Sequence, residues 1–283
     1  MAAVQQRTIL VAGRKSPCLE AGGEAGEAAV FVHGNPGSCE DWRALIEQVG
    51  DYGRALAVDM PGFGAADKPA DFDYSVPGYA AHLDAVMREL KITRAHLVLH
   101  DFGGPWGLTW AAQHPEQVAS VTLVNIGILP GYSWHYLARI WRTPIVGELF
   151  QLMASRAGFH LLFKHGNPRG LPAAFIDQMY DRYDAGTKRA VLRLYRASGP
   201  EVVASFSAQV VSALQPRDIP ALVVWGACDP YVPVAYAEAQ KEVFPHAQIV
   251  ILPQSGHWPF ADDPAGVASH VVPFLRRQMA AKP

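Results

Sequence analysis

The sequence predicts an α/β fold in which a mostly parallel sheet is flanked by helices and interrupted by a helical insertion. Short apolar runs rich in β-branched residues alternate along the chain with helical patterns, as in sheets covered on both faces. Several of these runs are apolar at every position, as strands buried on both faces require. The alternation stops after Asn125 and resumes at Ile219, so we expect one sheet built from two stretches of the chain.

The predicted elements follow one another in a regular order. Strands are expected at residues 8–12, 28–33, 54–59, 96–100, 120–125, 221–225 and 248–252. Helices are expected at residues 42–49, 77–90, 104–114, 234–243 and 264–279. The glycine-rich stretch 22–26 predicts a loop between the first two strands.

Residues 127–214 differ in character from the segments on either side. This stretch has no clear strand pattern, is rich in aromatic residues, and has a helical character with scattered Pro, Gly and Arg. We therefore expect a core whose first part spans residues 1–126 and whose second part spans residues 215–283, with a helical cap at residues 127–214. A length of 283 residues suits one large domain with an insertion.

The composition narrows the classes of function. Hydrophobic residues make up 50% of the chain, and the net charge is −2 without a basic stripe, so nucleic acids and anionic membrane surfaces are not expected partners. No apolar run reaches the roughly 18 residues that a membrane helix needs, and residues 1–7 lack the form of a signal peptide. The 3 cysteines show no CxxC spacing, which indicates free thiols and a cytoplasmic location.

Asp101 occupies the most informative position in the chain. Residues 96–100 predict an apolar strand, and Gly103 and Gly104 open a predicted helix, so Asp101 is expected on a sharp turn between them. A side chain on such a turn projects away from the sheet. A carboxylate placed there can attack a saturated carbon and become an alkyl ester of the protein, whereas a serine would give acyl transfer. Asp101 is therefore a candidate nucleophile for electrophiles such as epoxides and alkyl halides.

The HGNPG motif at residues 33–37 is a candidate oxyanion hole. It follows a predicted strand, and its turn can present backbone N–H groups to a reacting oxygen. We expect the backbone N–H groups of Asn35 and Phe102 to serve together in this role. Taken alone, the motif would be an ordinary Asn-Pro turn. Its assignment as an oxyanion hole therefore depends on the other motifs that follow it.

Asp229 and His257 are candidates for the acid and the base. Asp229 closes a predicted strand within the motif WGACDP, where an acid can orient a histidine, although an Asp before Pro is more often only a turn residue. His257 lies on a loop after the last predicted strand. With Asp101, these residues follow the chain order nucleophile, acid, histidine.

Taken together and in this order, the HGNPG, Asp101, Asp229 and His257 motifs resemble those of the α/β-hydrolases. Within that fold they resemble the aspartate-nucleophile branch, which contains epoxide hydrolases and haloalkane dehalogenases. The resemblance covers nearly the whole chain, although Leu99 stands where the family often has a small residue. It implies the α/β-hydrolase fold with a helical cap inserted after the sixth strand. It also implies that water is the only co-substrate and that no metal or cofactor is needed.

The resemblance favours an epoxide hydrolase over a haloalkane dehalogenase. Dehalogenases commonly hold the halide with an indole N–H directly after the nucleophile, where this chain has Phe102, which has no donor. Asn35 matches a second dehalogenase donor, so that alternative stays open. Epoxide hydrolases place cap tyrosines to protonate the opened ring, often in a segment that ends Tyr-Arg. The segment LRLYRA at residues 192–197 resembles it, which makes Tyr195 the candidate for ring opening.

The other assignments implied by the resemblance are less direct. Tyr136 is the candidate for a second donor and Tyr132 is its competitor, and either ring could instead pack the cap onto the core. Some dehalogenases carry the acid at the position of Asn125, but an amide cannot balance the charge of an imidazolium. Asp229 is therefore expected to orient His257.

The expected reaction is the hydrolysis of a small apolar epoxide to a vicinal diol through an ester on Asp101. The alternatives are a haloalkane dehalogenase that uses the same nucleophile and a non-catalytic ligand-binding module on a hydrolase scaffold. For the oligomeric state of the protein, a homodimer stays open. The aromatic cap predicts a largely apolar pocket, and the side chains expected to contact the substrate are His33, Pro36, Trp134, Trp141 and Trp258.

Overall fold

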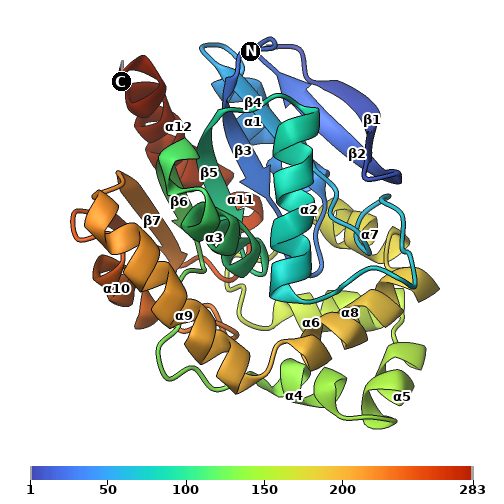
Figure 1. Cartoon of the computed structure of the whole chain (residues 1–283). Coiled ribbons are helices and arrows are strands. Elements are labelled where there is room, and N and C mark those ends of the chain that lie inside the picture. Colours follow the sequence, from blue (N-terminus) through green and yellow to red (C-terminus); the bar gives the residue numbers. More distant parts are fainter. Residues whose placement is uncertain (1, 282–283) are drawn as a thin grey trace.

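The computed structural model describes residues 2–281, and within that range a single eight-stranded sheet forms the centre of the molecule (Figure 1). Its strands are β1 (Gln5–Val11), β2 (Arg14–Ala21), β3 (Glu27–Val32), β4 (Arg54–Val58), β5 (Arg94–His100), β6 (Val118–Val124), β7 (Ala221–Gly226) and β8 (Gln248–Leu252). Their spatial order is β1-β2-β4-β3-β5-β6-β7-β8. β2 pairs antiparallel with β1 and β4, and every other pairing is parallel. The α/β class predicted from the alternating pattern is confirmed.

Strand β2 was not expected from the sequence. Lys15, Pro17 and Glu20 break its apolar pattern, and its neighbours in the sheet rather than its own composition hold it in place. It joins β1 through a two-residue turn in which Ala12 and Gly13 have φ values of +49° and +76°. Left-handed residues suit such hairpins, but an alanine gives little sign of one in a sequence. With β2 included, β6 is the sixth strand, and the cap begins after it, as the resemblance implied.

Helices cover both faces of the sheet. On one face, α1 (Arg43–Val49) packs against α12 (Pro264–Ala280). On the other face, α2 (Val76–Glu89), α3 (Gly103–Gln113) and α9 (Pro200–Leu214) lie side by side (Figure 1). The predicted helix at residues 234–243 forms only as α10 (Tyr236–Ala239) and a 3₁₀ turn. At this change of helix type, the buried side chain of Gln240 accepts from the backbone N–H of Ile128 and donates to its carbonyl oxygen.

The cap lies beyond the carboxyl ends of the parallel strands (Figure 1). Its helices are α4 (Tyr136–Arg142), α5 (Val146–Leu152), α6 (Arg156–Lys164), α7 (Ala173–Asp181) and α8 (Ala185–Ala197). The helical character predicted for residues 127–214 is therefore found. The last helix of that stretch, α9, leaves the cap and packs along α3, so it belongs to the layer that covers the sheet.

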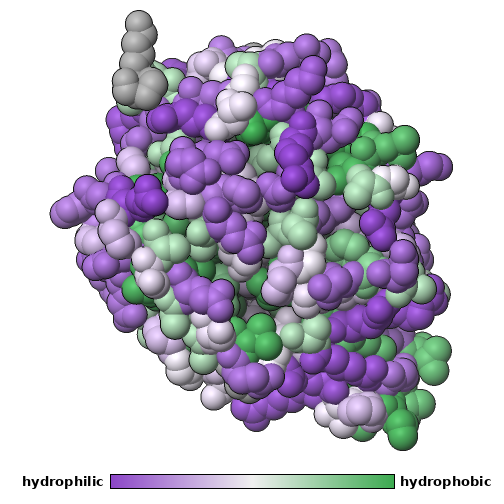
Figure 2. All heavy atoms as spheres, viewed as in Figure 1, coloured by the Kyte–Doolittle hydropathy of each residue, from purple (hydrophilic) through white to green (hydrophobic). Residues whose placement is uncertain are grey.

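The cap also carries the most exposed apolar side chains. Ile145, Leu149, Leu152 and Met153 are all more than half exposed, and Figure 2 shows an apolar group at the lower right, where Figure 1 places α5. None of the helices formed by residues 2–281 is long and apolar enough to cross a membrane. Over the same residues, no group of three or more His, Cys, Asp or Glu side chains is arranged to hold a metal ion.

Candidate active site

Asp101 stands on a sharp turn between β5 and α3, at the carboxyl edge of the sheet. Its backbone φ is +48°, a left-handed value that is unfavourable for a residue with a Cβ atom. The surroundings are tight, because a Cβ on Gly103 would collide with the Val32 carbonyl and a Cβ on Gly104 with the Ile126 side chain. The two glycines therefore allow the helix to start this close to the sheet.

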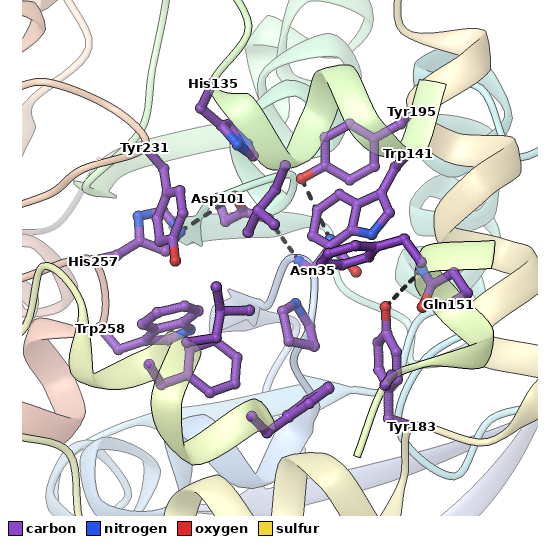
Figure 3. Close-up of a pocket in the computed structure, with 17 residues that line it drawn as sticks. Asn35, Asp101, His135, Trp141, Gln151, Tyr183, Tyr195, Tyr231, His257 and Trp258 are labelled. Carbon is purple, nitrogen blue, oxygen red and sulfur yellow. Dashed lines mark hydrogen bonds and ion pairs between the residues drawn. The ribbon is translucent and has the colours of Figure 1, made fainter. Parts of the chain in front are cut away.

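Both oxygens of the Asp101 carboxylate have partners (Figure 3). Oδ1 accepts a hydrogen bond from the backbone N–H of Asn35 at 2.6 Å. Oδ2 lies 3.4 Å from Nε2 of His257. A Cβ on Gly34 would collide with this carboxylate and with the Phe102 nitrogen, so the glycine lets the HGNPG turn approach both. The carboxylate thus has one oxygen fixed by a backbone amide and the other facing the histidine.

Asp229 lies on the other side of the His257 ring. Its Oδ2 is 2.6 Å from Nδ1 of His257. Its Oδ1 accepts hydrogen bonds from the backbone N–H groups of Tyr231 at 2.7 Å and Val232 at 2.9 Å. With these partners the carboxylate is fixed and remains a strong acceptor, so it can orient the imidazole and stabilise its charged form.

Asn125 links three segments around this acid. Its Nδ2 donates to Oδ2 of Asp229 at 2.7 Å and to the carbonyl oxygen of Gly256 at 3.3 Å. Its Oδ1 accepts from the backbone N–H of Gly226 at 2.9 Å. The sequence suggested only that this amide could not be the acid. In the structure it joins the ends of β6 and β7 to the loop that carries His257.

His100 holds the His257 loop from within the core. Its Nε2 lies 2.7 Å from the backbone carbonyl oxygen of His257, which can only accept, so Nε2 carries the proton. Burial lowers the pKa of His100 to about 3, and the nearby charge of His257 acts in the same direction. His100 is therefore neutral and positions the loop rather than exchanging protons.

The electrostatics of the site favour two carboxylates around a charged imidazole. Burial alone would raise the pKa of Asp101, but the hydrogen bond and charge of His257 outweigh it and hold that pKa at about 2. Burial alone would lower the pKa of His257, but Asp229 and Asp101 outweigh it and raise that pKa to about 10. At neutral pH the resting site thus holds an ionised nucleophile and an imidazolium.

A pH dependence of stability follows from the raised pKa of His257. A group whose pKa rises on folding stabilises the protein fully below its unfolded pKa of about 6.5 and loses that contribution as pH rises through the folded value. We expect the melting temperature of the wild type to fall more between pH 6.5 and pH 10 than that of His257→Gln. Thermal denaturation of both proteins at several pH values checks this. If the melting temperatures of the two proteins changed with pH in parallel, His257 would not be an imidazolium in the folded protein.

Two cavities meet at Asp101 in the described part of the chain. Both are lined by Asp101, His135, Tyr195 and Tyr231. Apolar side chains dominate the rest of the lining, for example Leu137, Phe159 and Leu162 in the first and Leu129, Val203 and Phe206 in the second. The carboxylate therefore faces two mainly apolar cavities, which we call the two arms.

Tyr195 lies above the carboxylate and lines both arms (Figure 3). Its oxygen accepts a long hydrogen bond of 3.4 Å from Nδ2 of Asn35, which leaves the hydroxyl proton for another acceptor. Burial raises the pKa of Tyr195 well above its ordinary value, and the charge of Asp101 raises it further. The hydroxyl therefore stays protonated beside the carboxylate, as a proton donor must.

A sequence model of the α/β-hydrolase fold family matches residues 29–264 of the chain.

The chain belongs to the α/β-hydrolase fold family.

Within this family, it is 27% identical to a cis-3-alkyl-4-alkyloxetan-2-one decarboxylase of Xanthomonas campestris, over 92% of this chain and 91% of the relative. The structure of a haloalkane dehalogenase from Bradyrhizobium elkani superposes with a TM-score of 0.86 at 25% identity, covering 99% of this chain and 100% of that one. An epoxide hydrolase from Vigna radiata superposes with a TM-score of 0.80 at 18% identity, covering 97% and 98%. The resemblance predicted from the motifs is confirmed.

The structure of this α/β-hydrolase brings together most of the residues that the sequence singled out. Asp101, Asp229, His257 and Asn35 are in direct contact, as described above, and Tyr195 lies over them. The other predicted side chains that line one of the two cavities are Pro36, Phe102, Trp134, Trp141 and Trp258.

Two predicted side chains lie elsewhere. His33 is fully buried and outside the lining of both cavities; its Nε2 accepts from the backbone N–H of Met60 at 3.0 Å, so the ring supports the turns around the site. Tyr136 is 45% exposed and also outside both linings. Because it lies at the start of α4, its side chain points away from the carboxylate. Its hydroxyl interacts with the hydroxyl of Tyr231 instead.

Sequence reasoning missed several residues of the site. His135 and Tyr231 line both arms, and Gln151 donates to the Tyr183 hydroxyl at 2.9 Å in the first arm (Figure 3). Tyr231 follows Asp229 by two residues, which is a signal that could have found it. His135, Gln151 and Tyr183 lie in the cap, where no local pattern tells which side chains face the core.

Proposed function

We propose that this α/β-hydrolase hydrolyses epoxides to vicinal diols through an ester on Asp101. The observation that carries the proposal is the pairing of Asp101 with Tyr195: an ionised carboxylate and a protonated hydroxyl line the same apolar cavities. Opening an epoxide requires both, because one carbon must be attacked while its oxygen gains a proton. Two apolar arms that share Asp101 suit an epoxide that carries an apolar group on each ring carbon.

The first step forms the ester. Oδ2 of Asp101 attacks an epoxide carbon, the carbon–oxygen bond of the ring breaks, and the resulting alkoxide takes the proton of Tyr195. Esterification removes one of the two negative charges that raise the pKa of His257, so the imidazolium becomes more acidic. Its proton can then return to Tyr195 by way of water, which leaves a neutral His257 and balances the charges.

The second step hydrolyses the ester. Neutral His257, oriented by Asp229, takes a proton from water, and the water oxygen attacks the ester carbonyl carbon of Asp101. Oδ1 becomes the oxyanion while it accepts from the backbone N–H of Asn35, which already lies at 2.6 Å. The Phe102 amide is the second candidate donor. Collapse of the tetrahedral intermediate releases the diol and regenerates the carboxylate and the imidazolium.

The Tyr195→Phe variant tests the pairing. With an epoxide that carries an alkyl group on each ring carbon, the wild type is expected to form the diol. The variant is expected to form the ester about 10²-fold more slowly, because the alkoxide loses its proton donor. Diol formation by chromatography and single-turnover loss of epoxide check this. An unchanged rate in Tyr195→Phe would remove the hydroxyl from the mechanism.

A haloalkane dehalogenase is the second candidate, and Trp141 is the observation that favours it. Its indole N–H is buried, lines the first cavity and has no hydrogen-bond partner among residues 2–281. With Nδ2 of Asn35 it could hold a halide ion that leaves the attacked carbon. Bromide release from a bromoalkane, lost in Trp141→Phe, would favour this reaction over epoxide hydrolysis.

The substrate in the name of the Xanthomonas relative suggests a third candidate activity. An oxetan-2-one is, like an epoxide, a strained oxygen ring, and the one in that name carries two alkyl groups. The two apolar arms here would suit such a molecule as well. Release of carbon dioxide from a dialkyl oxetanone, without turnover of epoxides, would favour that activity.

A further inference from the structure

His135 stands at the junction of the two arms, directly before α4. Its backbone is extended, with φ of −61° and ψ of 166°, and its side chain caps the helix by accepting the backbone N–H of Ala138 at Nδ1, 3.2 Å away. A backbone N–H can only donate, so Nδ1 must be the unprotonated nitrogen. In the neutral ring the proton is therefore on Nε2.

The ring is held neutral and faces the reacting groups. Burial lowers the pKa of His135 to about 4, although the charge of Asp101 opposes this shift. The ring centroid lies 5.1 Å from that of Tyr231 and 6.1 Å from that of Tyr195. Figure 3 shows His135 between these two rings, on the Asp101 side of the cap. A fixed N–H donor thus accompanies the Tyr195 hydroxyl.

Two neighbouring donors of the cap, Tyr132 and Trp134, are engaged with backbone carbonyl oxygens. The Tyr132 hydroxyl has one proton, and it donates that proton to the Tyr231 carbonyl oxygen at 2.8 Å. The indole N–H of Trp134 donates to the Ser198 carbonyl oxygen at 3.1 Å. Tyr136 lies outside both arms.

We propose that Nε2–H of His135 is the second hydrogen-bond donor to the epoxide oxygen during ring opening. Tyr195 transfers its proton to the developing alkoxide, and His135 donates a hydrogen bond without losing its own. The α4 cap fixes the tautomer, so the donor is in place before the substrate binds. This role rests on the proposed function and assigns to His135 the task that the sequence suggested for Tyr136.

The test isolates ester formation in the His257→Gln background, where the ester should persist. His135→Asn and His135→Ser both keep an N-cap acceptor for α4 but cannot reach the epoxide oxygen. We expect each to slow ester formation by about 10²-fold, the typical effect of one lost oxyanion donor. Tyr136→Phe, which changes the next residue in the sequence and one that lines neither arm, should form the ester as fast as His257→Gln alone. Melting curves confirm that each variant is folded.

The outcomes separate this proposal from the proposed function. Normal ester formation in both His135 variants would overturn the role of His135. So would a larger loss in Tyr136→Phe or in Tyr231→Phe than in the His135 variants, since it would give the role to that hydroxyl. Absence of an ester in His257→Gln itself would remove epoxide hydrolysis, and the role of His135 with it.

Discussion

Replacement of Asp101 by Asn is expected to reduce epoxide turnover by roughly 10⁴-fold or more and to abolish the covalent intermediate. An amide oxygen is a poor nucleophile, and no other carboxylate of the described site faces both apolar arms. Asn is nearly the same shape as Asp and can still accept from the backbone N–H of Asn35, which donates to Oδ1 at 2.6 Å in the wild type. The fold should therefore persist.

The measurement is a kinetic assay combined with intact-mass spectrometry. The mass of the Asp101→Asn protein before the assay shows that the amide has not reverted to a carboxylate. After exposure to the epoxide, no mass gain is expected. Substantial turnover by a protein that still carries the amide would place the nucleophile elsewhere.

Replacement of His257 by Gln is expected to stop the reaction after the first step. Asp101 keeps the Asn35 amide as a partner, so it can still attack, whereas the ester lacks a base to activate water. Ester hydrolysis should fall by about 10²- to 10⁴-fold. Each molecule of enzyme should consume one epoxide and release little diol.

Asp229→Asn is the matched variant for this second prediction. It leaves His257 in the site but removes the charge 2.6 Å from Nδ1, so ester hydrolysis should be slower than in the wild type and faster than in His257→Gln. Rapid-quench measurement of ester and diol distinguishes the steps. Full diol turnover by His257→Gln would contradict the proposed base.

The residues at the strand ends could be predicted because their signals are local. An apolar strand that ends at His100, followed by Asp101, Phe102 and two glycines, predicts a sharp turn at Asp101, and the structure has a left-handed φ of +48° there. The WGACDP motif placed Asp229 in the same way. Parallel strands end at one edge of the sheet, so these two turns and the HGNPG turn meet there.

The cap could not be predicted at the same level. Adjacent residues of a helix point about 100° apart, so whether His135 or Tyr136 faces the cavity depends on the residue at which α4 begins. That start is set by the N-cap bond from Ala138 to His135, and histidine is not among the residues that usually signal an N-cap. Strand β2 shows the same limit, because its partners rather than its composition hold it in the sheet.

The most direct test of the account is the intact mass of His257→Gln after exposure to an epoxide and, separately, to a bromoalkane, with the modified peptide located by fragmentation. The account predicts a gain equal to the whole epoxide mass on the peptide that contains Asp101. A gain equal to the alkyl group without bromine, and none from the epoxide, would contradict epoxide hydrolysis and favour a dehalogenase. No gain from either reagent would contradict the covalent scheme for these substrates and favour a ligand-binding module.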